Sequence, residues 1–221
     1  MKKLIECFLI SLVAALFWGC SATETSQVVQ PKTVDAMGTV YSGPKKKVAV
    51  GKFDNRSTYM QGLFSDGVDR LGGQAKTILI THLQQSGRFS VLDRANMEEI
   101  AREVKFEGGT QEIKGAQLIL TGQVTEFGRK VVGDQQLYGI LGSSKEQVAY
   151  AKVSLSAVDV VTSDVVYSVQ GAGEYTLSSR EVVGFGGRSG YDSTLNGKVL
   201  DLAIREAVNR MVEGAESGNL K

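Results

Sequence analysis

The side chains that most often carry catalysis are sparse in this sequence, and their spacing does not build a catalytic site. The single histidine, His82, lies on the apolar face of a predicted helix, where a core or interface role is expected. One histidine and two cysteines provide no cluster for zinc. The carboxylates Asp54, Asp66 and Asp69 share one loop and are interpreted as turn and cap residues. We therefore expect no enzymatic activity, no metal and no cofactor.

Nucleotide and acyl-transfer motifs are also missing from the sequence. It contains no P-loop and no G-x-S-x-G nucleophile motif. The glycine-rich stretch 184–187 (GFGG) does not fit a dinucleotide fingerprint, because no strand–turn–helix pattern surrounds it. The formal net charge is +1, and residues 1–19 account for that excess, so nothing favours binding to nucleic acid.

Cys20 is the residue for which a defined chemistry is predicted. Lys2 and Lys3 precede an apolar run from Cys7 to Trp18, which is too short for a transmembrane helix and is typical of a secretory signal. The run ends in Gly19-Cys20, as in a bacterial lipobox, in which the cysteine is acylated and becomes the first residue. We predict a signal peptide at 1–19 and a covalent lipid on Cys20. The alternative is a secreted protein with a leftover cysteine.

The residues after Cys20 indicate where such a lipoprotein would go and how it is attached. Ser21, rather than aspartate, follows the cysteine, which by the sorting rules of lipoproteins implies the outer membrane. Residues 20–44 are polar, have no helical period and are predicted to be a lipidated tether. The run Lys45 to Lys47 either binds phosphate head groups or forms a solvated strand edge. The tether leads into a predicted domain at 45–221.

The first half of this domain alternates strands and helices. Strands are predicted at 48–53, 89–92 and 118–124 from short apolar runs. A helix is predicted from Val68 to a left-handed cap at Gly87. A second helix, 95–105, is predicted to be capped by Asp93 and broken at 108–109.

The second half is organised around the stretch 147–177. Ala149, Ala151, Val153, Leu155 and Ala157 alternate with polar residues, and a second alternating run starts at Tyr167. This period of two predicts two strands with one buried face, joined by a turn at 162–164. The 26 glycines and two prolines favour glycine inside strands and turns. An amphipathic helix with a face from Val199 to Met211 is predicted at the end, and the tail after Glu213 is expected to fray.

Four segments together resemble the CsgG family of outer-membrane lipoproteins, which form the curli secretion channel and include holdfast-anchoring relatives. They are KKVAVGKFDN, TILITHLQQSGRFSVLDRANMEEI, LILTGQVTEFG and AKVSLSAVDVVTSDVVYSV. The resemblance implies an α+β fold: a periplasmic α/β domain with a mixed sheet and helices, plus two long β-hairpins that contribute to an oligomeric transmembrane β-barrel. The candidate membrane hairpins are 127–147 and 171–196, since a barrel strand needs about 9–11 residues.

The resemblance also implies a pore constriction and a set of partners. The family's constriction loop corresponds to 54–64, where Tyr59 and Phe64 match the family's aromatic pair and Leu63 replaces an asparagine. In a monomer these aromatics would instead fold back onto the core. The expected partners are other copies of this chain in a ring, the outer membrane, secreted protein cargo and periplasmic accessory proteins. The alternative is a periplasm-facing lipoprotein without a pore that acts as a scaffold or activates a peptidoglycan synthase.

Overall fold

The structure is a computed structural model that describes residues 30–59, 69–135, 143–181 and 195–220. The chain from Thr33 onward forms one compact unit. Its elements, in chain order, are β1 (Lys46–Asn55), α2 (Arg70–Ser86), β2 (Phe89–Leu92), α3 (Met97–Glu107), β3 (Leu118–Gln135), β4 (Ser143–Asp159), β5 (Val165–Glu181) and α4 (Leu195–Glu216).

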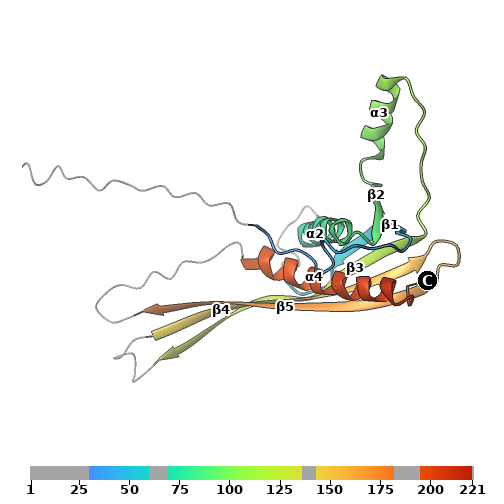
Figure 1. Ribbon diagram of the computed structural model, residues 1–221. Coiled ribbons are helices and arrows are strands. Elements are labelled where there is room, and N and C mark those ends of the chain that lie inside the picture. The colour runs from blue at the N-terminus through green and yellow to red at the C-terminus, as the bar shows by residue number, and fades with distance from the viewer. Residues whose placement is uncertain (1–29, 60–68, 136–142, 182–194, 221) are drawn as a thin grey trace, which may run out of the picture. The chain divides into compact units, whose positions relative to one another are not determined.

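The strands form one mixed sheet in the order β2-β1-β3-β4-β5. β1 runs parallel to both β2 and β3, because α2 and α3 return the chain to the same end of the sheet. β3, β4 and β5 are antiparallel neighbours. Helices α2 and α4 lie side by side on one face of the sheet (Figure 1). The predicted mixed α+β domain is therefore confirmed.

The alternation in β4 decides which face of the sheet is buried. The side chains of Ala149, Ala151, Val153, Leu155 and Ala157 are at most 2% exposed, and Tyr150 between them is 39% exposed. The small side chains on the buried face let α4 lie close to the sheet. The apolar residues of α2 and α4 complete this core, among them Leu79, Leu83, Leu200, Ile204 and Met211.

The helix ends show which local sequence signals were sufficient to predict a helix cap. Gly87 and Gly108 end α2 and α3 with φ of 70° and 74°, as expected of left-handed caps. The predicted cap of the second helix was wrong: α3 starts at Met97 with Asn96 as its N-cap residue. Asp93 instead accepts hydrogen bonds from the backbone N–H groups of Ala95 and Asn96, three residues too early to cap the helix.

The C-terminal tail was also mispredicted. Helix α4 continues to Glu216, and the chain then turns back at Gly218, which has a φ of 77°. The backbone N–H of Leu220 donates to the carbonyl oxygen of Gly214, and the Leu220 side chain is 1% exposed. Burial of this single leucine holds the tail against the core, so the tail does not fray.

The three antiparallel strands are longer than the sequence pattern indicated. They contain 18, 17 and 17 residues, and β3 and β4 stay paired from Leu118↔Asp159 to Gln135↔Ser143. In the first candidate hairpin, 127–147, residues up to Gln135 belong to β3, those from Ser143 belong to β4, and 136–142 lie outside the described residues. In the second, 171–196, residues up to Glu181 belong to β5, and 182–194 lie outside the described residues.

Candidate functional site

The two ends of the loop between β1 and α2 are tied together by one carboxylate. Asp69 Oδ2 accepts a hydrogen bond of 2.6 Å from the backbone N–H of Asn55, and its Oδ1 accepts one of 2.7 Å from Gly72 N–H. Asp69 is therefore the N-cap of α2 and also the closure of the loop 56–68. The two ends of the loop are therefore held at a fixed separation.

The start of the loop is organised by the Asn55 side chain. Its Oδ1 accepts hydrogen bonds from the Ser57 backbone N–H at 3.0 Å and from Ser57 Oγ at 2.6 Å. Its Nδ2 donates to the carbonyl oxygen of Tyr59 at 2.9 Å. Ser57 is 4% exposed, so this polar turn is enclosed rather than solvated. The direction in which Tyr59 leaves the sheet is therefore fixed by Asn55.

Tyr59 then enters a cluster that we call the junction, formed by Tyr59, Phe127, Arg129 and Asn196. The rings of Tyr59 and Phe127 meet edge to face, with centroids 4.7 Å apart. Asn196 Nδ2 donates to the Tyr59 hydroxyl at 2.7 Å, and Arg129 Nη2 donates to Asn196 Oδ1 at 3.1 Å. The junction joins the loop, β3 and the first turn of α4, which are far apart in the sequence.

The structure describes only one of the predicted site residues, Tyr59. Tyr59 is half-buried and packs against the core, the arrangement expected for a monomer. Leu63, Phe64 and Cys20 lie outside the described residues. Arg129, which would be costly in contact with lipid, is held by Asn196 at the base of the hairpin. Phe127 and Asn196 were not singled out from the sequence, because nothing local marks a residue whose partners are distant.

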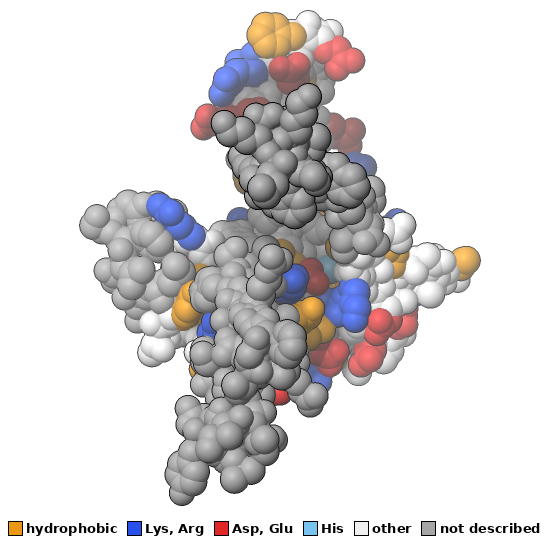
Figure 2. Space-filling view, turned by 90° about the vertical axis from the view of Figure 1, so that its left-hand side faces the viewer, with side chains coloured by type: hydrophobic (Ala, Val, Ile, Leu, Met, Phe, Trp, Pro, Cys, Tyr) orange, Lys and Arg blue, Asp and Glu red, His pale blue; other side chains and the backbone are white. Residues whose placement is uncertain are grey.

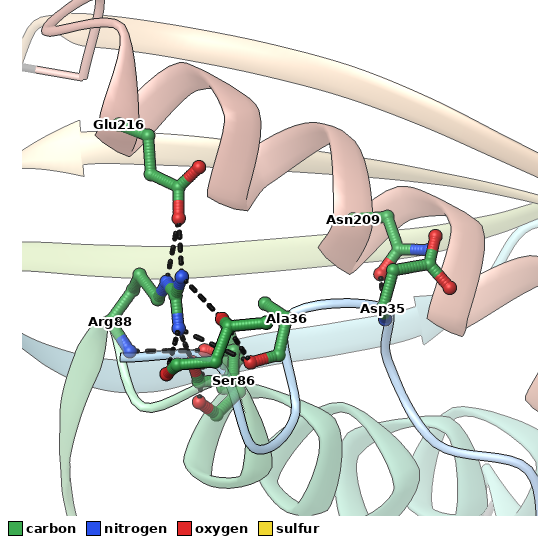
Figure 3. Close-up of polar contacts among 8 residues, drawn as sticks. Asp35, Ala36, Ser86, Arg88, Asn209 and Glu216 are labelled. Atoms are coloured by element: carbon green, nitrogen blue, oxygen red, sulfur yellow. Dashed lines mark hydrogen bonds and ion pairs between the residues drawn. The ribbon is translucent and has the colours of Figure 1, made fainter. Parts of the chain in front are cut away.

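A second polar cluster, the clasp, is centred on the buried Arg88 (Figure 3). Its guanidinium lies 2.6 Å from Glu216 of α4 and donates to the carbonyl oxygens of Ala36, Thr39 and Ser86. It also stacks over the ring of Tyr41 with 5.0 Å to the centroid. A planar fork of five donors is suited to collecting several acceptors in this way.

The clasp holds a strap, defined as residues 33–43, onto the domain. Val34 is 2% exposed, and Asp35 and Asn209 exchange two hydrogen bonds of 3.1 and 2.7 Å. The structure therefore differs from the prediction of a tether over 20–44, since its last part is packed against α4 and the turn after α2. One buried valine and a few polar contacts dock the strap, and neither produces a period in the sequence.

We expect Arg88→Ala to release the strap. The substitution removes the arginine donor from Glu216 and from three backbone carbonyl oxygens, of which only that of Ala36 is also seen to accept from Thr39, so the free energy of unfolding should fall by about 2–3 kcal/mol. Tryptic cleavage at Lys32 and Lys45 should accelerate in parallel, because the strap between them is no longer docked. Thermal melting and a timed digest of the full-length protein measure the two effects.

Arg210→Ala is the matched control for the clasp. Arg210 also pairs with a glutamate on α4, Glu206 at 2.8 Å, but half of its side chain is exposed. An exposed i,i+4 pair contributes about 0.3–0.5 kcal/mol, so both the melting temperature and the digest should stay close to those of the parent. Equal effects of the two substitutions would show that the clasp is an ordinary surface pair.

Other polar groups in the described part of the chain are structural. His82, 3% exposed, joins the two long helices through Nε2 to Asp201 Oδ1 at 2.8 Å, in line with the core or interface role predicted for it. Among described residues, no three His, Cys, Asp or Glu side chains are placed to share a metal ion. The visible side chains in Figure 2 mix acidic and basic groups rather than forming a patch of one sign.

Within the same described residues, no helix has both the length and the apolar character required to span a membrane.

Residues 30–216 match the family model described as the curli production assembly/transport component CsgG. A protein of Neisseria meningitidis serogroup B that is named as a lipoprotein is 55% identical over 218 residues, which cover 99% of this chain and 97% of that protein. The match therefore includes the loop, the long strands and α4.

Solved structures resemble the chain more weakly. A PelC dodecamer from Paraburkholderia phytofirmans is 22% identical, with a TM-score of 0.35 over 76% of this chain and 93% of that one. Lipoprotein GNA1162 from Neisseria meningitidis is 18% identical, with a TM-score of 0.37 over 76% of this chain and 99% of that one. At these values neither likeness assigns a partner or an assembly to this chain.

Proposed function

Because this chain belongs to the CsgG family of curli production assembly and transport components, we propose that it is a subunit of an outer-membrane secretion channel. In this proposal Cys20 carries a lipid, and copies of the chain assemble into a ring. The hairpins at 127–147 and 171–196 close one shared barrel, and the loop 54–64 narrows its pore. The channel exports or anchors an extracellular protein, and the main domain faces the periplasm.

The length of β3, β4 and β5 is the observation that carries this proposal. Strands in globular domains usually have five or six residues, whereas these have 17 or 18. Helix α4 begins near Tyr175, over which Lys198 Nζ lies at 5.5 Å. The three strands continue past that point to Gln135, Ser143 and Glu181 (Figure 1). The hairpin from 127 to 147 has the length of two barrel strands and a turn.

The geometry of the loop fits a constriction as well. A loop that narrows a pore must keep one conformation in every subunit, and here Asn55 and Asp69 fix the two ends of the connection between β1 and α2, which contains the proposed constriction. Four strands from one chain cannot close a barrel, so the proposal requires several copies. In such a ring each copy would present the same apolar residues toward the axis, which is an effective barrier to water and ions.

We expect Phe64→Ala to raise single-channel conductance. The substitution removes a large side chain from the proposed collar, and the contacts of Tyr59 with Phe127 and Asn196 remain. The measurement uses full-length protein extracted in detergent, imaged for rings and then inserted into planar bilayers. Ring size should be unchanged, so that any rise in conductance comes from the collar.

Deletion of 131–143 provides the companion experiment. It removes the outer part of the first hairpin but keeps Arg129 and its contact with Asn196. Conductance should vanish while the domain keeps its melting transition. If the intact protein forms no rings, and after removal of its lipid is a soluble monomer without detergent, the channel proposal is wrong.

A scaffold or activator without a pore is the second candidate function, and the position of Tyr59 favours it. The ring packs against Phe127 and the hydroxyl accepts from Asn196, so this aromatic already has a folding role in a single chain. In a scaffold the long strands would form a surface for a partner protein. The same bilayer experiment separates the two functions, since a scaffold without a pore gives no conductance.

A further inference from the structure

We propose that Asn196 is a positioning residue that couples the start of the loop after β1, at Tyr59, to the first long hairpin and to α4. The significance of this coupling for transport rests on the proposed function above, whereas the coupling itself does not. Three segments meet at its side chain: Tyr59 lies near the start of the loop, Arg129 lies in the first hairpin, and Asn196 is the second residue of α4.

The contacts are long-range, so they constrain the tertiary arrangement rather than local structure. The pair Tyr59–Asn196 spans 137 residues of sequence, and the pair Arg129–Asn196 spans 67. Phe127, 4% exposed, supports the tyrosine ring from β3 at the same time. Displacing any one of the three segments would therefore break a contact with each of the others.

The amide is the group that suits these two partners. Arg129 offers only donors, so it needs the carbonyl oxygen of Asn196, and the Tyr59 hydroxyl accepts from its NH₂ group. An aspartate at this position would also accept from the guanidinium, and could accept from the tyrosine hydroxyl in place of donating to it. It would additionally lie in the first turn of a helix, where negative charge is favourable. An alanine side chain could not hydrogen-bond to either partner.

These differences define the test, which follows amide hydrogen exchange in the full-length protein. The backbone N–H groups of Asn55, Arg56 and Ser57 are hydrogen-bonded at the base of the loop. Asn196→Ala should raise exchange in the peptide 52–59, and in β3 around Phe127, by about 10-fold, the effect of losing one to two hydrogen bonds. Asn196→Asp should restore the parent rates.

Asn209→Ala is the matched control, since Asn209 is on the same helix and also bonds a distant segment. It should speed exchange in the strap around Asp35 and leave the peptide 52–59 unchanged. Tyr59→Phe removes the hydroxyl but keeps the ring, so it should reproduce the effect of Asn196→Ala on the loop. In the double variant, exchange in the peptide 52–59 should then be no faster than in either single variant, as expected when both substitutions remove the same contact.

The proposal is overturned if Asn196→Ala leaves the peptide 52–59 at its parent rate, or if Asn209→Ala accelerates it equally. If Asn196→Ala does not fold, Tyr59→Phe decides by the same measurement. Failure of the channel proposal has a separate readout, which is the absence of conductance when the parent protein is measured in planar bilayers. Altered exchange in a protein that conducts no ions would preserve the coupling and discard the channel.

Discussion

Gly171→Val is expected to separate α4 from the sheet and to lower the melting temperature by roughly 6–12 °C. A Cβ atom on Gly171 would overlap the carbonyl oxygen of Ala203 and lie 2.5 Å from the backbone nitrogen of Ala207. Both obstacles are main-chain atoms of α4, so a change of rotamer cannot relieve the overlap. The cost should be about 3 kcal/mol or more, which in a domain of this size corresponds to the stated change in melting temperature.

The effect should be large because α4 contributes much of the core. Its buried residues include Leu195, Leu200, Ile204, Val208 and Met211, and a helix that is lifted from β5 exposes them together. Thermal melting of the full-length protein, followed by circular dichroism, is the measurement. Ala172→Val is the control: it adds two methyl groups to the neighbouring exposed position of the same strand and should change stability by less than about 0.5 kcal/mol. Equal melting of Gly171→Val and the parent would contradict the close packing.

The parts of the fold that were predictable from the sequence are those that repeat or that require a special backbone. The period of two in β4 located the buried face, because five small or apolar residues cannot all be solvated on one side of a sheet. Gly87 and Gly108 were sufficient to end two helices, because left-handed backbone conformations favour glycine. The glycines of β5 were seen only as alternating residues. Their role is to allow the close approach of α4, and this role could be recognised only from the position of the helix in the structure.

The parts that were not predictable depend on single pairs of distant residues. Arg88 and Glu216 are 128 residues apart, and nothing local distinguishes this arginine from an exposed one. The strap was interpreted as tether because its composition is polar, although Val34 alone contributes a buried anchor. Asn196 similarly follows a stretch without a period. For the candidate site, the loop was located by resemblance, but the partners of Tyr59 came only from the tertiary structure.

Docking of the strap has a consequence for how far the domain can lie from the membrane. If Cys20 carries the lipid, thirteen residues separate it from Thr33, where the compact unit begins. Thirteen residues reach at most roughly 45 Å when fully extended. With the strap docked, the compact unit could then lie no farther than this from the lipid, and release of the strap would add residues 33–43 to that reach.

Cys20→Ser is expected to abolish fatty-acid labelling completely, because a serine hydroxyl cannot replace the thiol at which the lipid is attached. Each buried methylene contributes about 0.8 kcal/mol to membrane binding, so loss of the acyl chains removes on the order of 10 kcal/mol per chain. Metabolic labelling with a radioactive fatty acid is the direct measurement. Cys7→Ser is the matched control, since Cys7 lies within the predicted signal and should be removed with it, which leaves labelling at the parent level.

Fractionation of the same cells shows whether anything besides the lipid attaches the protein to the membrane. If the lipid is the only attachment, Cys20→Ser moves the protein from the outer membrane to the soluble periplasmic fraction. If the long strands insert as a ring, part of the variant stays in the membrane and needs detergent for extraction, although it carries no label. Undiminished labelling of Cys20→Ser would show that the lipid is not on this cysteine. In that case residues 1–19 would be an ordinary secretory signal, and the strap would not be connected to a lipid anchor at Cys20.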